Sequence, residues 1–333
     1  MDYRSDSPQI LLDFLTYHET IRSHSKATVD EYYLDLRNFF RYLKLHRGYV
    51  PAKTPLDEIP VSDVDVEFVR RVTLSEVYAY LSYLSRDRVK NPRSHSAEYG
   101  LTAASRARKI ATIRSFYRYL CSKAKLIDEN PVQDLDSPKL QKSLPRYLSL
   151  EESQALLRAV EGKNAERDYC ILCIFLNCGL RISEIVGLNV TDVHEDYLRV
   201  LGKGNKERIL FLNDATREAL QAHLASRMLI KATDGNALFL SNRRTRMSRE
   251  TVHSMVKKTL LKAGLDSTQY SAHKLRHTAA TLMLQNGVDV RTLQEVLGHE
   301  HLNTTEIYTH VDNEQLRVAA QANPLGKFKP GDK

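Results

Sequence analysis

The segments S-A-H-K-L-R-H-T-A-A-T (residues 271–281) and L-Q-E-V-L-G-H-E-H-L-N-T-T-E-I-Y-T-H (residues 293–310) indicate a helical domain. Apolar residues recur in both at helical spacing. Gly298 follows an apolar run that ends at Leu297, and a glycine in that position is typical of a helix end. The residue after Gly298 is therefore placed where a side chain can face a cleft. The helices of this region are expected at 277–287, 289–297 and 304–309.

Four side chains in this stretch and two upstream of it are suited to handling a phosphodiester. They are Arg181, Lys203, His273, Arg276, His299 and Tyr308. An arginine guanidinium can hold two phosphate oxygens at once. A tyrosine hydroxyl can attack phosphorus and hold it covalently. Such a set requires no metal ion, and the sequence predicts neither a metal site nor a cofactor.

The order of these six residues resembles the tyrosine recombinase family, which includes phage integrases and the Xer recombinases. The family pattern is Arg…Lys…His-x-x-Arg…His…Tyr, and every position occurs here in that order. The Leu297-Gly298-His299 box and the nine-residue step to Tyr308 also fit. The resemblance covers residues 145–320 closely and the N-terminal part more loosely. It is greatest to the XerC/XerD type of recombinase.

The resemblance implies an enzyme that cleaves and rejoins DNA strands through a 3′-phosphotyrosyl intermediate, exchanging strands between two sites. Tyr308 would attack the scissile phosphorus, while Arg181 and Arg276 would neutralise the transition state. Because the bond energy stays in the phosphotyrosine, neither ATP nor a metal would be needed. Glu184 lies one helical turn after Arg181 and is expected to orient its guanidinium.

The remaining three residues would handle protons and a further hydrogen bond. Lys203 would protonate the leaving 5′-oxygen, and His273 would assist deprotonation of Tyr308. His299 would donate a hydrogen bond to the transition state. A zinc site at His273-x-x-x-His277 is the rival interpretation, but no carboxylate occupies the H-E-x-x-H position and two arginines would oppose a cation.

The chain's 333 residues predict two domains, mainly α-helical. The four cysteines include a Cys170-x-x-Cys173 pair, but no second ligand pair follows, so buried reduced thiols are expected. Capping boxes are expected where Thr28, Thr73 and Ser149 each precede a glutamate by three residues.

The chain is expected to divide into an N-terminal helical core-binding (SAM-like) domain at 1–133, a linker at 134–147, and a catalytic domain at 148–333 that ends in an exchange helix.

The catalytic domain is expected to contain one small antiparallel β-hairpin. Residues 197–201 and 207–212 alternate apolar and polar positions, and a glycine-rich basic turn separates them. Lys206 in this turn could contact DNA.

The net charge of +8 and the pI of about 9.2 permit nucleic-acid binding without proving it. A basic row on the helix that begins at Thr102 is expected to face outward as a second DNA contact: Arg106, Arg108, Lys109, Arg114 and Arg118.

The expected partner is double-stranded DNA with an inverted-repeat recombination site. The resemblance implies a homo-tetramer on DNA, or a hetero-tetramer with a related recombinase. Residues 313–320 would form a helix that docks on a neighbouring protomer, or one that packs on its own domain. The absence of an apolar run of membrane-span length and of a signal-peptide core predicts a cytoplasmic protein.

Two other functions share parts of this pattern. A type IB topoisomerase uses the same covalent tyrosine chemistry, but the His-x-x-Arg pair and the Leu-Gly-His box argue against it. A DNA-binding accessory protein without catalysis would not need all six residues. The biological role stays open between chromosome-dimer resolution, which serves chromosome partition at cell division, and integration or excision of a mobile element.

Overall fold

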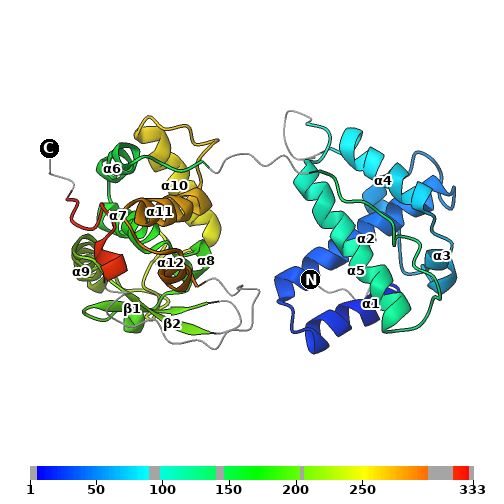
Figure 1. Cartoon of the computed structure of the whole chain (residues 1–333), viewed down its shortest axis with the longest axis horizontal. Coiled ribbons are helices and arrows are strands. Elements are labelled where there is room, and N and C mark those ends of the chain that lie inside the picture. The colour runs from blue at the N-terminus through cyan, green and yellow to red at the C-terminus, as the bar shows by residue number, and fades with distance from the viewer. Residues whose placement is uncertain (1–5, 90–97, 140–145, 203–205, 299–317, 330–333) are drawn as a thin grey trace. The chain divides into compact units, whose positions relative to one another are not determined.

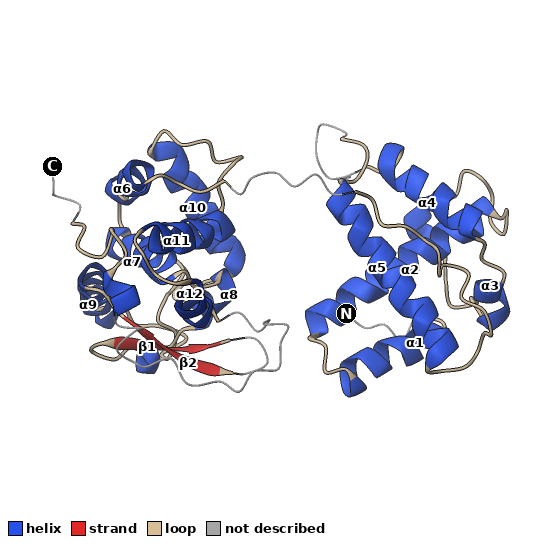
Figure 2. Ribbon diagram, in the orientation of Figure 1, coloured by secondary structure: helices blue, strands red, loops and turns tan. Residues whose placement is uncertain are grey.

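The computed structural model describes residues 6–89, 98–139, 146–202, 206–298 and 318–329. The chain divides into two compact units, Met1–Ser143 and Leu144–Lys333, each with its own core. Figure 1 labels the elements of both units, and Figure 2 shows helices in blue and the paired strands in red among the described residues. The prediction of a mainly α-helical protein with one antiparallel hairpin is confirmed.

The N-terminal unit packs its helices around an aromatic core. Phe14, Phe40 and Phe116 meet with their ring centroids 5.4 to 5.6 Å apart. These rings join the first, second and last long helices of the unit. The elements are α1 (Gln9–Thr16), the π-helical η1 (Tyr17–Ile21), α2 (Lys26–His46), η2 (Leu56–Glu58), α3 (Val66–Arg70), α4 (Leu74–Arg86) and α5 (Ala103–Ser122).

Helix starts follow the capping signals at two of the three predicted boxes. Thr73 and Ser149 each cap a helix with reciprocal bonds to the glutamate three residues later. The box predicted at Thr28 is wrong, because α2 begins earlier, at Lys26, with Ser25 as its N-cap. The Ser25 hydroxyl accepts the backbone N–H of Thr28 at 3.3 Å. A serine three residues upstream offered an equivalent cap, and the helix starts from it.

The basic row predicted on α5 does not lie wholly outside. Lys109 is buried and donates to the carboxylate of Asp35, which also accepts two bonds from Arg108. Burial lowers the pKa of Lys109, against the opposing charge of Asp35. The expectation that Lys109 faces DNA is therefore wrong, since a buried Asp35 on α2 requires a cationic partner.

The other members of the row differ in exposure. Arg106 donates to the Ser85 hydroxyl and to the Leu101 carbonyl, and Arg114 donates to the Ser137 hydroxyl. Arg118 is exposed. A DNA contact by these residues stays a prediction.

His18 lies buried at the π-helical turn that follows α1. Its Nδ1 is 3.2 Å from His24 Nδ1, and its Nε2 is 3.2 Å from the Ser115 hydroxyl. Burial, together with the charges of His24 and Arg22, lowers the pKa of His18 to about 4. His18 is therefore neutral in the folded protein at neutral pH.

The N-terminal unit is expected to lose stability in mild acid through His18. The pKa of His18 in the folded protein lies below the ordinary 6.5. Above pH 6.5 the imidazole is neutral in both states and does not affect the free energy of unfolding. As the pH falls from 6.5 toward 4, the unfolded chain takes up a proton that the folded protein does not, so the free energy of unfolding decreases. The loss should be on the order of 3 kcal/mol. Calorimetry of the whole chain between pH 7 and pH 4 should show that His18→Gln, which cannot titrate, flattens this slope. Equal slopes in the two proteins would contradict the assignment.

The second unit is also helical, with the hairpin at one edge (Figure 1). Strand β1 (Tyr197–Leu201) pairs antiparallel with β2 (Glu207–Phe211), in a register that places Leu198 opposite Leu210. The helices are α6 (Leu150–Arg158), α7 (Ala165–Cys173), the π-helical η3 (Ile174–Cys178), α8 (Ile182–Gly187), η4 (Val190–Asp192), α9 (Asp214–Met228), α10 (Arg249–Lys262), α11 (Ala272–Gln285) and α12 (Val290–Leu297).

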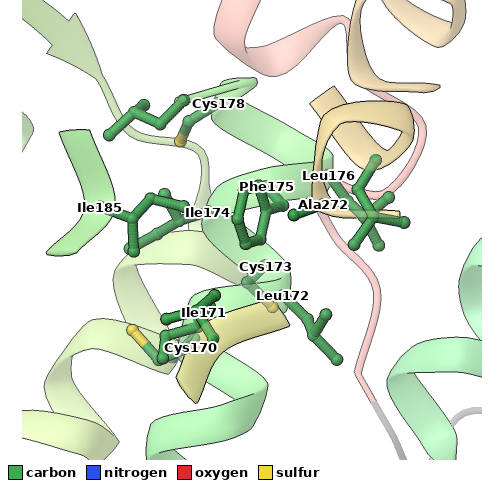
Figure 3. Packing of buried hydrophobic residues seen from close by; sticks show 14 of the residues in the cluster. Cys170, Ile171, Leu172, Cys173, Ile174, Phe175, Leu176, Cys178, Ile185 and Ala272 are labelled. Carbon is green, nitrogen blue, oxygen red and sulfur yellow. The ribbon is translucent and has the colours of Figure 1, made fainter. Parts of the chain in front are cut away.

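The centre of this unit is the continuous apolar run through α7 and η3. Figure 3 shows Cys170–Leu176 and Cys178 of the run packed with Ile185 of α8 and Ala272 of α11. Cys170 and Cys173 are free and fully buried, and burial raises the pKa of both thiols. They pack as small apolar side chains, as expected. The run therefore holds the ends of η3, α8 and α11 near one another.

The described part of the C-terminal segment packs on its own unit. Asn323 donates to the Leu176 carbonyl at 2.9 Å, and the Gly326 carbonyl accepts the backbone N–H of Ala215 at 2.8 Å. Ala319 is buried beside Leu293 and Leu297. Residues 313–317 of the predicted exchange helix lie outside the described residues.

In the part of the chain that the structure describes, no helix has the length and apolar character needed to cross a bilayer.

Candidate functional site

The site begins where the buried run ends. Gly179 takes a positive φ of 61°, which terminates η3, and the extended Arg181 then caps α8. Glu184, at the third position of α8, accepts the Arg181 backbone N–H at 2.8 Å and its Nη1 at 2.9 Å. The Arg181 side chain remains 37% exposed. Arg181 is thus held from behind by Glu184 while its guanidinium stays accessible.

Arg276, on α11, is buried and held by helix ends. Its Nη1 donates to the Gly179 carbonyl and its Nη2 to the Leu297 carbonyl, both at 2.7 Å. Carbonyls at helix C-termini carry partial negative charge and favour a cation. Burial and the charge of Arg181 lower the pKa of Arg276 to about 10, with Glu184 opposing them. Arg276 is therefore still a cation at neutral pH, in a fixed orientation.

A third arginine, which the sequence reasoning missed, completes the cluster. Arg208 on β2 donates from Nη1 and Nη2 to the two carboxylate oxygens of Glu184, each at 3.0 Å. A sequence signal for it existed, because Arg208 alternates with Leu210 and so shares the buried face of the hairpin. The sequence reasoning instead chose Lys206, which is exposed at the edge of the described part of the hairpin.

Glu184 is the negative centre of this group of charges. Its side chain is 4% exposed, and Arg276 Nη1 also lies 3.8 Å from its Oε2. Burial alone would raise the pKa of Glu184, but the bonds from Arg208 and Arg181 outweigh it and hold the pKa below its usual value. Three guanidiniums surround one carboxylate, so the cluster has excess positive charge and is suited to binding an anion.

Two glycines lie against Arg208, and Gly298 is the one whose side chain would crowd it. A Cβ built on Gly298, whose φ is +63°, would lie 3.0 Å from the Arg208 guanidinium carbon. A Cβ on Gly202 would lie 3.4 Å from Arg208 Nη1. The Gly298 carbonyl also accepts a bond from Arg181 Nη2 at 3.1 Å. Gly298 is thus both the end of α12 and a wall of the arginine cluster.

Gly298→Ala is expected to impair the site more than a matched glycine change does. Gly264→Ala is the control, because Gly264 has a φ of +73° but no atom within 4 Å of a built Cβ. Both changes carry the backbone cost of about 1–2 kcal/mol for a positive φ. Only Gly298→Ala should also displace Arg208, lowering the single-turnover rate of the DNA cleavage that the family resemblance implies about 10- to 100-fold. Equal cleavage by the two variants would contradict a role for this contact.

The structure places the other predicted residues less completely. His273 is exposed and lies three residues before Arg276 on α11. Lys203, His299 and Tyr308 lie outside the described residues. Within the described ranges, no group of three or more His, Cys, Asp or Glu side chains is arranged to hold a metal ion. Arg181, Glu184 and Arg276 are the predicted site residues that the structure brings into one cluster.

Comparisons with known proteins find similar sequences over most of the chain. The model of the phage integrase family matches residues 146–315. The tyrosine recombinase XerC of Caldanaerobacter subterraneus subsp. tengcongensis is 50% identical over 321 residues, 96% of this chain and 88% of the relative. The tyrosine recombinase XerD of Halalkalibacterium halodurans is 32% identical over 321 residues, 94% of this chain and 97% of the relative.

Solved structures share the fold at lower identity. The XerH site-specific recombinase bound to difH substrate in a pre-cleavage complex matches with a TM-score of 0.61 and 23% identity, over 93% of this chain and 84% of that one. A lambda integrase dimer bound to a COC′ core site matches with a TM-score of 0.56 and 17% identity, over 90% of this chain and 99% of that one. At these identities the likeness shows the fold alone.

Proposed function

The chain belongs to the phage integrase family of tyrosine recombinases, and we propose from this premise how its residues carry out site-specific DNA recombination. It is an Xer-type recombinase, and we propose that it acts as a transesterase without metal or ATP. The observation that carries the mechanism is the cluster of Arg181, Arg208 and Arg276 around the single carboxylate of Glu184. Its uncompensated positive charge is suited to a scissile phosphate.

We assign phosphate binding to Arg181 and Arg276. The partly exposed Arg181 can present its guanidinium to a non-bridging oxygen, and the charge on Arg276 is held beside it by two helix-end carbonyls. Donors whose orientation is set before the reaction stabilise developing negative charge without reorganisation. As the pentavalent transition state gathers charge, these two cations counter it.

The remaining steps are proposed for residues carried over from the family pattern. Tyr308 attacks phosphorus in line, forming a 3′-phosphotyrosyl bond as the bond to the 5′-oxygen breaks. Lys203 gives its proton to that oxygen, and His273 takes the proton from the Tyr308 hydroxyl. His299 donates a hydrogen bond to the phosphate. The 5′-hydroxyl of a partner strand then reverses the step and completes strand exchange.

The proposed substrate is double-stranded DNA with two inverted half-sites, bound by a homo-tetramer or by a hetero-tetramer with a related recombinase. The XerH relative in complex with difH and the lambda integrase relative at its core site are both bound to DNA. Chromosome-dimer resolution and integration or excision of a mobile element use the same chemistry. The DNA sequence that is cut decides between these roles.

The test is covalent trapping on nicked DNA. Duplexes that tile the neighbouring genomic DNA carry a nick close to the cut, so that a short fragment diffuses away and cleavage cannot reverse. A protease-sensitive, 3′-linked adduct on one sequence only, without metal or ATP, is the expected result. Recombination between two intact copies of that sequence should follow.

Other outcomes would support different functions. Adducts on every duplex, with relaxation of supercoiled DNA by a monomer, would favour a type IB topoisomerase. Tight DNA binding with no adduct on any duplex would favour an accessory protein without catalysis.

A further inference from the structure

Arg208 has a well-defined place in the site, yet the proposed mechanism gives it no task. Its side chain is 15% exposed, so it is less accessible than Arg181. Both of its terminal nitrogens are used by Glu184. Among the described residues its Nε is buried and has no hydrogen-bond partner. Both terminal nitrogens of Arg208 are thus engaged with a carboxylate, whereas those of Arg276 lie on uncharged carbonyls.

The two oxygens of Glu184 are shared between two arginines. Oε1 accepts from Arg181 Nη1 and Arg208 Nη1, at 2.9 and 3.0 Å. Oε2 accepts from the Arg181 backbone N–H and Arg208 Nη2, at 2.8 and 3.0 Å. Arg208 binds both oxygens with one planar guanidinium, and together with the two Arg181 bonds it fixes the plane of the carboxylate.

The charge balance of the cluster also depends on Arg208. With three guanidiniums and one carboxylate, the net charge is +2. Without Arg208 it falls to +1, and the carboxylate, then held by the two Arg181 bonds alone, can shift toward Arg276, which already lies 3.8 Å from Oε2. Glu184 would then neutralise one of the two cations that face the phosphate.

We propose that Arg208 is a positioning residue for DNA cleavage. It clamps Glu184, so that Glu184 orients Arg181 without neutralising the positive charge offered to the scissile phosphate. This inference rests on the proposed binding of phosphate by Arg181 and Arg276. Arg208 lies on strand β2 and is not one of the six residues of the family pattern.

The first measurement compares two arginines of the same hairpin. Arg199 on β1 also binds a carboxylate, donating to Asp192 from Nε and Nη2 at 3.1 and 2.8 Å, and it makes no bond to Glu184. Arg208→Gln is expected to slow single-turnover adduct formation on the order of 10- to 100-fold, as for groups that orient a ligand from behind in metal sites. Arg199→Gln should change it less than about 3-fold. Arg208→Lys, which keeps the charge but reaches one oxygen, should lie between wild type and Arg208→Gln.

The second measurement separates positioning from a general loss of structure. In a Glu184→Gln background, Arg208→Gln should cost little more, because its proposed target is already gone. On DNA whose scissile phosphate carries a methyl group in place of one non-bridging oxygen, and is therefore uncharged, the cost of Arg208→Gln should also shrink. These two reductions together are the expected result.

Two results would overturn the inference. One is an Arg208→Gln protein that cleaves as fast as wild type. The other is an equal loss in both backgrounds and on both phosphates, as a purely structural role predicts. Absence of any adduct with the wild-type protein on all duplexes would instead overturn the proposed function, and this inference with it.

Discussion

Tyr308→Phe is expected to abolish covalent adduct formation, lowering it on the order of 10⁴-fold or more. Phenylalanine keeps the ring but lacks the oxygen that would attack phosphorus, so no bond to DNA can form. DNA binding should persist, because most of the affinity comes from contacts to the phosphate backbone. Adduct yield on the nicked duplex, read on a denaturing gel, measures the first effect, and a mobility shift on the intact duplex measures the second.

Two other tyrosines of the same unit provide controls for this change. Tyr197 stacks on His194, with ring centroids 4.3 Å apart, and Tyr270 is partly buried beside the main core. Phenylalanine at either position removes one hydroxyl and should leave the adduct yield within about 3-fold of wild type. A normal adduct in Tyr308→Phe, or its loss in Tyr197→Phe or Tyr270→Phe, would show that the nucleophile is another residue.

Arg276→Lys is expected to reduce strand cleavage on the order of 10²- to 10³-fold. Arg276 uses its two terminal nitrogens on the Gly179 and Leu297 carbonyls, and it is held there beside Arg181 and Glu184. A lysine ammonium is a single point donor and cannot bridge two carbonyls while offering charge to a phosphate. Single-turnover cleavage at saturating protein isolates this effect from DNA affinity, which should change less than about 3-fold.

The matched control is another buried arginine of the same unit. Arg227 on α9 donates to the carbonyls of Gly235 and Ala237 and contacts none of the cluster. Arg227→Lys should lower thermal stability by a similar amount but leave cleavage unchanged at a temperature where the protein is folded. If the two variants cleaved equally well, Arg276 would have only a structural role.

Local features of the fold were predictable because their causes lie within a few residues. The caps at Thr73, Thr102 and Ser149 each use a side chain that bonds a backbone N–H three positions on. The helix ends at Gly179 and Gly298 follow from glycine's tolerance of positive φ. The same reasoning failed at Thr28, where Ser25 offered a cap one turn earlier. When two local cap signals lie one turn apart, spacing alone does not say which of them starts the helix.

Charged residues were harder to assign, because their partners lie far apart in the chain. Lys109 is paired with Asp35, 74 residues away, and Arg208 is paired with Glu184, 24 residues away. Helical periodicity alone placed Lys109 in a surface row. The alternation of strand β2 predicts that Arg208 points to the buried face. The basic composition of the adjacent turn favoured Lys206 instead.

The sequence by itself determined the family, the helical architecture, the single hairpin and the order of the chemical groups, since these depend on residue type and local spacing. Only the tertiary structure decided that Arg181, Arg208 and Arg276 share one buried carboxylate, and that Lys109 is part of a core ion pair. The physical reason is desolvation. A charge taken out of water must find its partner in space. Spacing along the chain does not specify which distant residue that will be.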